Sequence, residues 1–319
     1  MRTAFLGSYG FGNLGDELCL LEAMQRYPSR DAWIFSVRPE YTGRFVTQSG
    51  FFRYRAELEN IQPERVVLGG GGVGFWPSLR DSLHWMSDHV RRGAECHIHN
   101  IGVGKISQPE WFDDKIAREV ITKVASFTVR DHVSRWMVLE WNFGRDPGLT
   151  FYPERNLQAD LSLNALLPDG PLLGISITGQ KAMTDALARN EQRVRRMLQP
   201  YRSYKVVPII SVNHPWDTDE DDVAGFLRFE QRFLGGFDVV LRETLDPAWW
   251  DANLTPLRLK GLISRCDLLI SQRKHNIIHA IGAKTPFIAL HPSEDDSLQR
   301  IMLSLHNQID PVCSFLSLH

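Results

Sequence analysis

The fold is decided near the start of the chain, by the segment Thr3-Ala4-Phe5-Leu6-Gly7-Ser8-Tyr9-Gly10-Phe11-Gly12-Asn13-Leu14-Gly15-Asp16-Glu17. Its first residues, 3–7, are typical of a short buried strand, and residues 14–26 have the pattern of an amphipathic helix. A strand that leads through a glycine-rich turn into a helix is the first part of a βαβ unit. The segment therefore predicts a parallel sheet with helices on its faces.

The same alternation continues along the chain. Further strand patterns occur at residues 32–37, 65–68, 95–101, 126–129, 172–177, 205–210, 237–241, 267–271 and 287–290. Residues 142–171 break the rhythm, because they collect glycine and proline around one apolar patch. We therefore expect an α/β protein with two doubly wound Rossmann-like domains facing a cleft, residues 1–150 and 171–319, with a linker at 151–170. In such sheets, ligands bind beyond the carboxyl ends of the strands.

The composition is that of a globular protein without a large surplus of charge. Among 319 residues, 36 basic and 38 acidic side chains leave a net charge of −2, and the isoelectric point is about 6.6. Since this balance gives no broad positive field, we expect no nucleic acid as a partner. The four cysteines are scattered without a CxxC pair, which favours a reducing compartment and excludes a thiolate metal cage. No apolar stretch approaches the ~18 residues of a membrane span, so we expect a cytoplasmic protein.

The turn at residues 10–15 matches the dinucleotide fingerprint G-x-G-x-x-G. That interpretation places a pyrophosphate at the N-terminus of the helix, where Asp16 and Glu17 would repel it. An NADP variant, in which Arg38 holds the 2′-phosphate, stays open. The local alternative is that Asn13 caps the helix, the two acids complement its dipole, and the glycines form the turn.

Two further motifs follow predicted strands of the first half. The run Gly69–Gly72 marks either close approach of the backbone or a turn with positive φ. The amides of Gly70 and Gly71 are suited to bind an anion or to lie against a sugar ring, and a plain turn is the alternative. Arg130, which follows the strand pattern at 126–129, either contacts a ligand or pairs with its neighbour Asp131.

The strongest group of candidates follows an apolar strand pattern in the second half, at Ser271-Gln272-Arg273-Lys274-His275. We expect Ser271 to cap the helix that comes next. Cations in the first turn of a helix oppose its dipole, at a cost of a few tenths to about 1 kcal/mol, so their presence at a strand end indicates a function. Arg273 has the shape to bind a carboxylate or phosphate with two hydrogen bonds, and His275 exchanges protons near neutral pH.

Histidines supply weaker candidates. His275 and His279 have the i, i+4 spacing of zinc ligands, but no third ligand accompanies them, so we expect no metal site and a packed position for His279. Asn213 and His214 follow a strand pattern and are candidates for contact with a ligand. The acidic residues at 217–222 have the chemistry to coordinate a divalent ion, but we favour the alternative that they mark an ordinary helix start.

Together these motifs resemble the polysaccharide pyruvyl transferase family. The resemblance extends over nearly the whole chain, with four motifs in the family's order and spacing: Gly12-Asn13-Leu14-Gly15-Asp16-Glu17, the glycine run 69–72, Val129-Arg130-Asp131, and Ser271-x-Arg273-x-His275 before the Ala-Ile-Gly-x-x-x-Pro-Phe segment at 280–287. It implies a two-domain fold similar to the GT-B glycosyltransferases.

The resemblance also implies an activity. Phosphoenolpyruvate is the expected donor, a saccharide or lipid-linked oligosaccharide receives pyruvate as a ketal in cell-envelope or exopolysaccharide biosynthesis, and no cofactor is needed. His275, Arg273 and Asp16 are the expected catalytic residues, with His275 as the acid and Asp16 or Glu17 as the base. The residues expected to bind donor or acceptor are Gly12, Asn13, Gly15, Glu17, Gly70, Gly71, Arg130, His214 and Ser271.

Two other functions stay open at this point. One is a glycosyltransferase of the GT-B type, whose nucleotide-sugar would place its diphosphate at the helix after Ser271. The other is a non-catalytic glycan-binding subunit. The motifs do not encode the acceptor sugar, the ketal linkage or the oligomeric state. A lipid-linked acceptor would bring the protein to the inner face of the cytoplasmic membrane, although the sequence contains no basic amphipathic helix to anchor it there.

Overall fold

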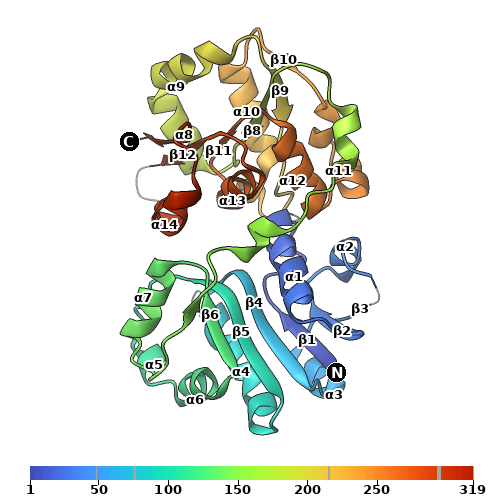
Figure 1. Ribbon diagram of the computed structural model, residues 1–319, viewed down its shortest axis with the longest axis vertical. Helices are drawn as coiled ribbons and strands as arrows, with labels where there is room; N and C mark the ends of the chain where they lie inside the picture. The colour runs from blue at the N-terminus through green and yellow to red at the C-terminus, as the bar shows by residue number, and fades with distance from the viewer. Residues whose placement is uncertain (48, 75–76, 215, 293–295, 319) are drawn as a thin grey trace. The chain divides into compact units, whose positions relative to one another are not determined.

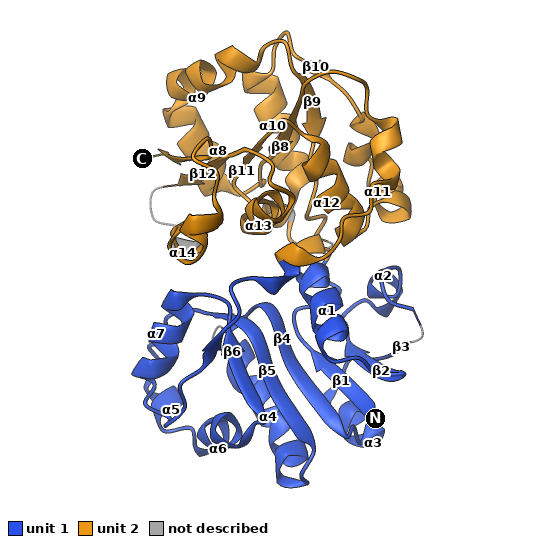
Figure 2. Cartoon of the chain, viewed as in Figure 1, with its two compact units in different colours: residues 1–11, 16–154 blue, residues 12–15, 155–319 orange. Residues whose placement is uncertain are grey.

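The computed structural model divides the chain into two compact units (Figure 2). Unit 1 contains residues 1–11 and 16–154, and unit 2 contains residues 12–15 and 155–319. The structure describes residues 1–47, 49–74, 77–214, 216–292 and 296–318.

The boundary between the units lies at residues 154 and 155, within the expected linker at 151–170. Residues 155–170 count with unit 2 because Lys260 donates hydrogen bonds to the carbonyl groups of Arg155 and Leu157. Residues 12–15, expected in the first domain, also count with unit 2. There Asn13 forms an isolated β-bridge with Val212, a backbone pairing that the sequence of the turn alone does not reveal.

Unit 1 contains, among its described residues, a seven-stranded parallel sheet in the order β3-β2-β1-β4-β5-β6-β7 (Figure 1). The strands are β1 (Arg2–Leu6), β2 (Asp31–Phe35), β3 (Ser49–Phe52), β4 (Arg65–Gly74), β5 (Glu95–Val103), β6 (Ser126–Val129) and β7 (Gly148–Leu149). The helices are α1 (Leu14–Arg26), α2 (Pro39–Thr42), α3 (Arg55–Ile61), α4 (Ser78–Arg91), α5 (Pro109–Phe112), α6 (Lys115–Lys123) and α7 (His132–Glu140). The strand order reverses between β1 and β4, which is where open α/β sheets bind ligands.

Unit 2 repeats this plan with six described strands in the order β10-β9-β8-β11-β12-β13, all parallel. The strands are β8 (Leu172–Ser176), β9 (Lys205–Pro208), β10 (Asp238–Val239), β11 (Leu268–Ser271), β12 (Phe287–Pro292) and β13 (Ser314–Leu318). The α-helices are α8 (Lys181–Arg189), α9 (Glu191–Leu198), α10 (Asp222–Phe233), α11 (Pro247–Asn253), α12 (Pro256–Arg265), α13 (Lys274–Ala283) and α14 (Asp296–Leu305). The short 3₁₀ helices are η1 (Pro153–Asn156), η2 (Ser162–Leu166), η3 (Gln199–Tyr201), η4 (Thr218–Glu220), η5 (Arg242–Leu245) and η6 (His306–Gln308).

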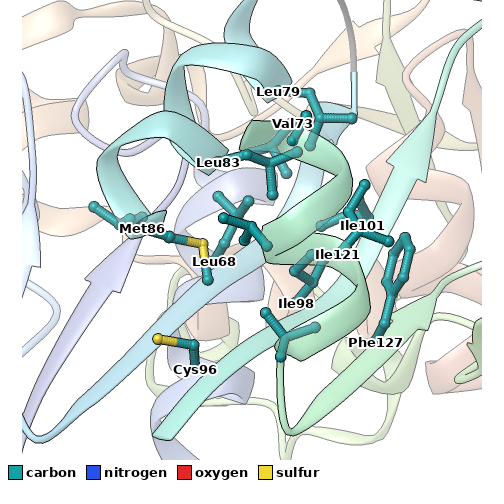
Figure 3. Packing of buried hydrophobic residues seen from close by; sticks show 14 of the residues in the cluster. Leu68, Val73, Leu79, Leu83, Met86, Cys96, Ile98, Ile101, Ile121 and Phe127 are labelled. Atoms are coloured by element: carbon teal, nitrogen blue, oxygen red, sulfur yellow. The ribbon is translucent and has the colours of Figure 1, made fainter. Parts of the chain in front are cut away.

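Both faces of the sheet in unit 1 are covered. On one face, Leu68 of β4 and Ile98 of β5 pack in the same cluster as Leu83 and Met86 of α4 (Figure 3). Successive side chains of a strand point to opposite faces, so Val67, beside Leu68, belongs to a separate cluster with residues of α1. Strands that are buried on both faces appear in the sequence as continuous apolar runs, which is why the short runs could be interpreted as strands.

Two global features accompany this fold. Among the described residues, none of the helices combines the length and the apolar composition that crossing a bilayer requires. The cysteines are unpaired, and three of them, Cys19, Cys96 and Cys266, are buried as packing side chains.

Candidate active site

The glycine run of β4 allows helix α1 to lie close to the sheet. Gly69, Gly70 and Gly71 have φ values of 144°, 76° and 85°, which side chains rarely permit. A Cβ atom on Gly70 would lie 2.4 Å from the Cβ of Cys19, and one on Gly71 would lie 2.6 Å from Oδ1 of Asp16. Both the close approach and the positive φ that the sequence offered as explanations are therefore present. The half-buried carboxylate of Asp16 lies against the backbone of β4.

Arg130 is the most unusual side chain of unit 1. It follows β6, is 3% exposed, and its guanidinium lies flat against the backbone of Gly102, where a Cβ atom would be 2.2 Å from Cζ. Its Cζ lies 5.6 Å from the ring centre of Tyr152. Within the described part of the chain, Nε and Nη1 are buried and have no hydrogen-bond acceptor.

Asp131 does not satisfy this arginine. The shortest contact runs from Nε of Arg130 to Oδ2 of Asp131 at 3.6 Å, beyond hydrogen-bond length. Asp131 instead caps helix α7, accepting the amide of Ser134 at 2.6 Å and the hydroxyl of Tyr152 at 3.1 Å. Burying a guanidinium whose N–H groups have no acceptor lowers the free energy of unfolding. Of the two alternatives left open by the sequence, contact with an anionic ligand is the one that this geometry favours.

Glu17 does not lie where an acceptor base is needed. It is 1% exposed, and its Oε1 accepts the amide of Gly10 at 2.7 Å and the hydroxyl of Thr42 at 3.3 Å. Burial raises its pKa to about 8, so the side chain is largely protonated at neutral pH. The expectation that Glu17 acts as base or binds substrate is therefore wrong in this geometry. It holds the turn at Gly10, together with Arg38, whose Nε donates to the Gly10 carbonyl at 2.8 Å.

Glu17→Gln is predicted to change how stability depends on pH. In the wild type the folded state keeps the proton up to about pH 8, whereas the unfolded state loses it near pH 4.5. The folded state therefore binds more protons between these values, and its free energy of unfolding falls as the pH rises, by up to about 5 kcal/mol. Glutamine keeps the acceptor for Gly10 without titrating. Urea unfolding at pH 5.5 and 9 measures this effect. The free energy of unfolding of the variant should rise relative to that of the wild type at pH 9, and Glu110→Gln, at an exposed position, is the control. Parallel pH profiles would contradict the prediction.

In unit 2, a polar pocket lies at the start of α13. It has a volume of about 210 Å³ and is lined by residues that include Asn13, Gln180, Ser211, Gln272, Lys274 and His275. The helix begins at Lys274, two residues later than a cap at Ser271 implies, and its N-cap is Arg273, which makes no side-chain capping bond. Ser271 is therefore not the cap. Its hydroxyl accepts the amide of Arg273 at 3.0 Å and fixes the turn between β11 and α13.

Arg273 does not point its guanidinium into open space for an anion. Its Nε donates to Oδ1 of Asp222 at 2.7 Å, and its Nη1 donates to Oε2 of Glu220 at 2.5 Å. Asp222 is fully buried and also accepts the amides of Ser211 and Val212 through Oδ2, at 2.9 and 3.0 Å. Arg273 also lines the polar pocket, and its expected catalytic role stays a prediction. Its side chain ties α13 to the loop after β9, because acids that looked like helix-start signals fold back onto it.

Arg273→Gln is therefore predicted to destabilise the protein. The change leaves the buried carboxylate of Asp222 without its cation, which costs about 3–5 kcal/mol. Urea unfolding at pH 7.5 measures the loss, and Arg196→Gln, at an exposed position of α9, is the matched control. An unchanged free energy of unfolding for Arg273→Gln would show that the ion pair contributes nothing to the fold.

His275 lies where the sequence predicts a reactive histidine. It is half-buried, lines the polar pocket, and packs on Gly15, where a Cβ atom would lie 2.2 Å from ring atom Nδ1. Gly15 is therefore required by the close approach of the ring. Asn13 caps α1, as expected, because its Oδ1 accepts the amide of Gly15 at 3.0 Å, while the Gly12 carbonyl accepts the amide of Asn213 at 2.9 Å.

Asn276 is a member of this region that sequence reasoning missed. It is fully buried, and its Nδ2 donates to the hydroxyls of Ser176 and Ser211 at 2.8 and 3.1 Å. These bonds connect α13 to the ends of β8 and β9. The available signal was a polar residue on the otherwise apolar inner face of α13, between His275 and Ile277.

Two other histidines that the sequence singled out, His214 and His279, make contacts within unit 2. Nδ1 of His214 accepts the amides of Trp216 and Asp217 at 3.3 and 2.9 Å, so this atom orders its own loop, and Pro215 lies outside the described residues. His279 is 1% exposed, and burial lowers its pKa to about 3, which confirms a packed, neutral side chain. Among the described residues, no group of three or more His, Cys, Asp or Glu side chains is placed to hold a metal ion.

Solved structures with a similar fold cover nearly the whole chain. The UDP-GlcNAc 2-epimerase from Methanocaldococcus jannaschii is 8% identical, with a TM-score of 0.56 over 100% of this chain and 89% of that one. A putative UDP-N-acetylglucosamine 2-epimerase from Listeria monocytogenes is 12% identical, with a TM-score of 0.54 over 91% and 79%. The UDP-GlcNAc 2-epimerase from Neisseria meningitidis, bound to UDP-GlcNAc, is 6% identical, with a TM-score of 0.52 over 94% and 85%.

At such low identities these likenesses show the fold alone. They confirm the expected pair of parallel-sheet α/β domains of the GT-B-like kind. No protein with a curated description matches the sequence. A family model for polysaccharide pyruvyl transferases matches residues 13–294, which include the Arg130 and His275 regions described above. The chain belongs to the polysaccharide pyruvyl transferase family and is therefore a transferase that acts on polysaccharide.

Proposed function

We propose that this protein transfers pyruvate from phosphoenolpyruvate to a saccharide as a ketal, during cell-envelope or exopolysaccharide biosynthesis in the cytoplasm. The observation that carries the proposal is Arg130, a buried guanidinium with two N–H-bearing nitrogens that lack acceptors in the described part of the chain. Phosphoenolpyruvate offers a carboxylate and a phosphate, the groups that arginine binds best. The membership of the chain in its family supports the same reaction.

The donor needs a proton on its methylene carbon before a hydroxyl can attack. His275 lines a polar pocket at the start of α13 and supplies that proton in our proposal. Arg130 binds an oxyanion of the donor. Arg273 keeps α13 and the loop after β9 in place through its bonds to Asp222 and Glu220.

The acceptor contributes two hydroxyl groups. Protonation of the methylene carbon turns it into a methyl group and leaves a cation at the neighbouring carbon, which the first hydroxyl attacks as it loses its proton. The second hydroxyl then forms the other C–O bond, and inorganic phosphate leaves with the C–O bonding electrons and takes up the proton of this hydroxyl. Asp16, half-buried against the glycine run of β4, is the base in this proposal, and Gly70 and Gly71 offer bare backbone beside it.

Release of phosphate from phosphoenolpyruvate tests the proposal. The purified chain is incubated with phosphoenolpyruvate and a library of oligosaccharides that carry free diols, and phosphate is measured against reactions without acceptor. Matched reactions contain UDP- and ADP-sugars in place of phosphoenolpyruvate. We expect acceptor-dependent phosphate release with phosphoenolpyruvate alone. Glycosyl transfer from a nucleotide-sugar would favour the glycosyltransferase alternative, and glycan binding without turnover would favour a binding subunit.

A further inference from the structure

Unit 1 contains a cavity at the point where the strand order of its sheet reverses. It has a volume of about 230 Å³ and is lined by the ends of β1, β2 and β4 and by the first turns of α4, including Ser8, Phe11, Phe35, Asp81, Ser82 and Trp85. β1 and β4 are neighbours at the position where the strand order reverses (Figure 1). Nothing in the reaction described above uses this cavity.

Asp81, in the first turn of α4, is exposed to solvent, and Ser8 and Ser82 are half-buried. Among the described residues, the carboxylate of Asp81 and the hydroxyls of Ser8 and Ser82 have no hydrogen-bond or ion-pair partner. Asp88, on the same helix, is bonded to Arg55 at 2.8 Å. Among the described residues that line the cavity, Asp81 is the charged side chain, so this lining offers acceptors and hydroxyls that suit a neutral, hydroxyl-rich ligand better than a phosphate.

Aromatic rings form the other part of the lining. Trp85 is half-buried and meets Phe35 edge to face, with ring centres 5.6 Å apart, and Phe11 lines the cavity from the end of the first turn. Rings held in this way provide rigid apolar surfaces at low entropic cost, and they suit the C–H face of a sugar. The cavity is smaller than the ~300–1,000 Å³ clefts that enclose drug-sized ligands, so it suits one sugar ring and not an oligosaccharide.

We infer that this cavity binds one pyranose ring of the acceptor saccharide, with Asp81 and Ser82 bonding its hydroxyls and Trp85 packing on its face. The inference takes the class of ligand from the proposed function. The cavity borders β4, and Arg130 follows β6, two strands away in the same sheet. Neighbouring strands lie about 4.8 Å apart, so β4 and β6 are about 10 Å apart. A bound sugar ring and the donor together can span this distance.

Binding of simple pyranosides without phosphoenolpyruvate tests the inference. The probes are methyl pyranosides of glucose, galactose, mannose and N-acetylglucosamine, followed by saturation-transfer NMR and tryptophan fluorescence. We expect at least one to bind, with about tenfold weaker affinity in Asp81→Asn and about threefold weaker affinity in Ser82→Ala. Asp88→Asn should bind as the wild type does, and Trp85→Phe should remove the fluorescence change. Absence of binding by every probe, or equal affinity in Asp81→Asn, would overturn the inference.

Turnover separates this inference from the proposed function. With a productive acceptor, Asp81→Asn should raise KM for the acceptor about tenfold and leave KM for phosphoenolpyruvate unchanged. Pyranoside binding that depends on Asp81, combined with no reaction of phosphoenolpyruvate, would support the cavity and reject the pyruvyl donor. Phosphoenolpyruvate turnover with an acceptor KM unaffected by Asp81→Asn would support the donor and reject the cavity.

Discussion

Arg130→Gln is expected to weaken the binding of phosphoenolpyruvate about 100-fold or more. Truncating one partner of a buried charged pair costs about 2–5 kcal/mol of binding, most of it from the oxyanion left without its partner. In the free protein the same change removes a buried charge whose Nε and Nη1 lack acceptors among the described residues. Asp131 and Glu154 lose a neighbouring positive charge in this variant, so any change in the free energy of unfolding is measured separately from the change in binding.

Isothermal titration with phosphoenolpyruvate and urea unfolding measure the two effects on the same samples. Arg135→Gln is the control, because Arg135 lies on α7 five residues away and its exposed guanidinium is paired with Asp146. Arg130→Lys keeps the charge but cannot make two parallel hydrogen bonds, so its affinity should fall between those of the wild type and Arg130→Gln. Wild-type affinity in Arg130→Gln would remove Arg130 from the donor site.

His275→Gln is expected to lower kcat by about 100- to 10,000-fold, the range in which general acids contribute. Glutamine approximates the size of the ring, which packs on Gly15, and it cannot protonate carbon at neutral pH. KM for phosphoenolpyruvate should change little, because Arg130 supplies the anion contact in this account. His275→Ala should lose the same activity. It should also lower the free energy of unfolding, because the shorter side chain leaves a cavity beside Gly15.

Steady-state rates of phosphate release, measured from pH 5.5 to 9, test this prediction. The limb of the pH profile that reports the acid should disappear in His275→Gln, an effect that a purely structural change would not produce. His306→Gln, at an exposed position of unit 2, is the control. A His275→Gln protein that turns over at the wild-type rate with the same pH profile would assign the acid to another residue.

The sequence predicted the plan of both sheets because their strands are apolar on both faces. Each expected strand has a counterpart in the structure, although the pattern at 237–241 forms only the two-residue strand Asp238–Val239. The edge strands β3, β7 and β13 were missed, β3 because Ser49-Gly50-Phe51-Phe52 is short and contains a glycine. The compact units divide at residues 154 and 155, within the expected linker, and the carbonyl groups of Arg155 and Leu157 are bonded by Lys260, about a hundred residues later.

The errors in the candidate site share one cause, namely contacts between residues distant in the sequence. Arg273 looked like a free cation in a first helical turn, but its partner Asp222 lies 51 residues earlier. Glu17 looked like an acid at a helix start, and only the fold turns its carboxylate towards the amide of Gly10. Arg130 was a weak candidate because Asp131 stood beside it, and the structure shows that Asp131 is used by Ser134 and Tyr152.

The central claim is that pyruvate leaves phosphoenolpyruvate and becomes part of a glycan. It is tested most directly with phosphoenolpyruvate labelled with ¹³C at its methylene and neighbouring carbons, a library of oligosaccharides with free diols, and the purified chain, by NMR of the recovered glycan. The account predicts a labelled methyl group next to a labelled ketal carbon, with one phosphate released for each ketal. Glycan without label, whether the labelled carbons remain in phosphoenolpyruvate or appear as free pyruvate, would contradict it.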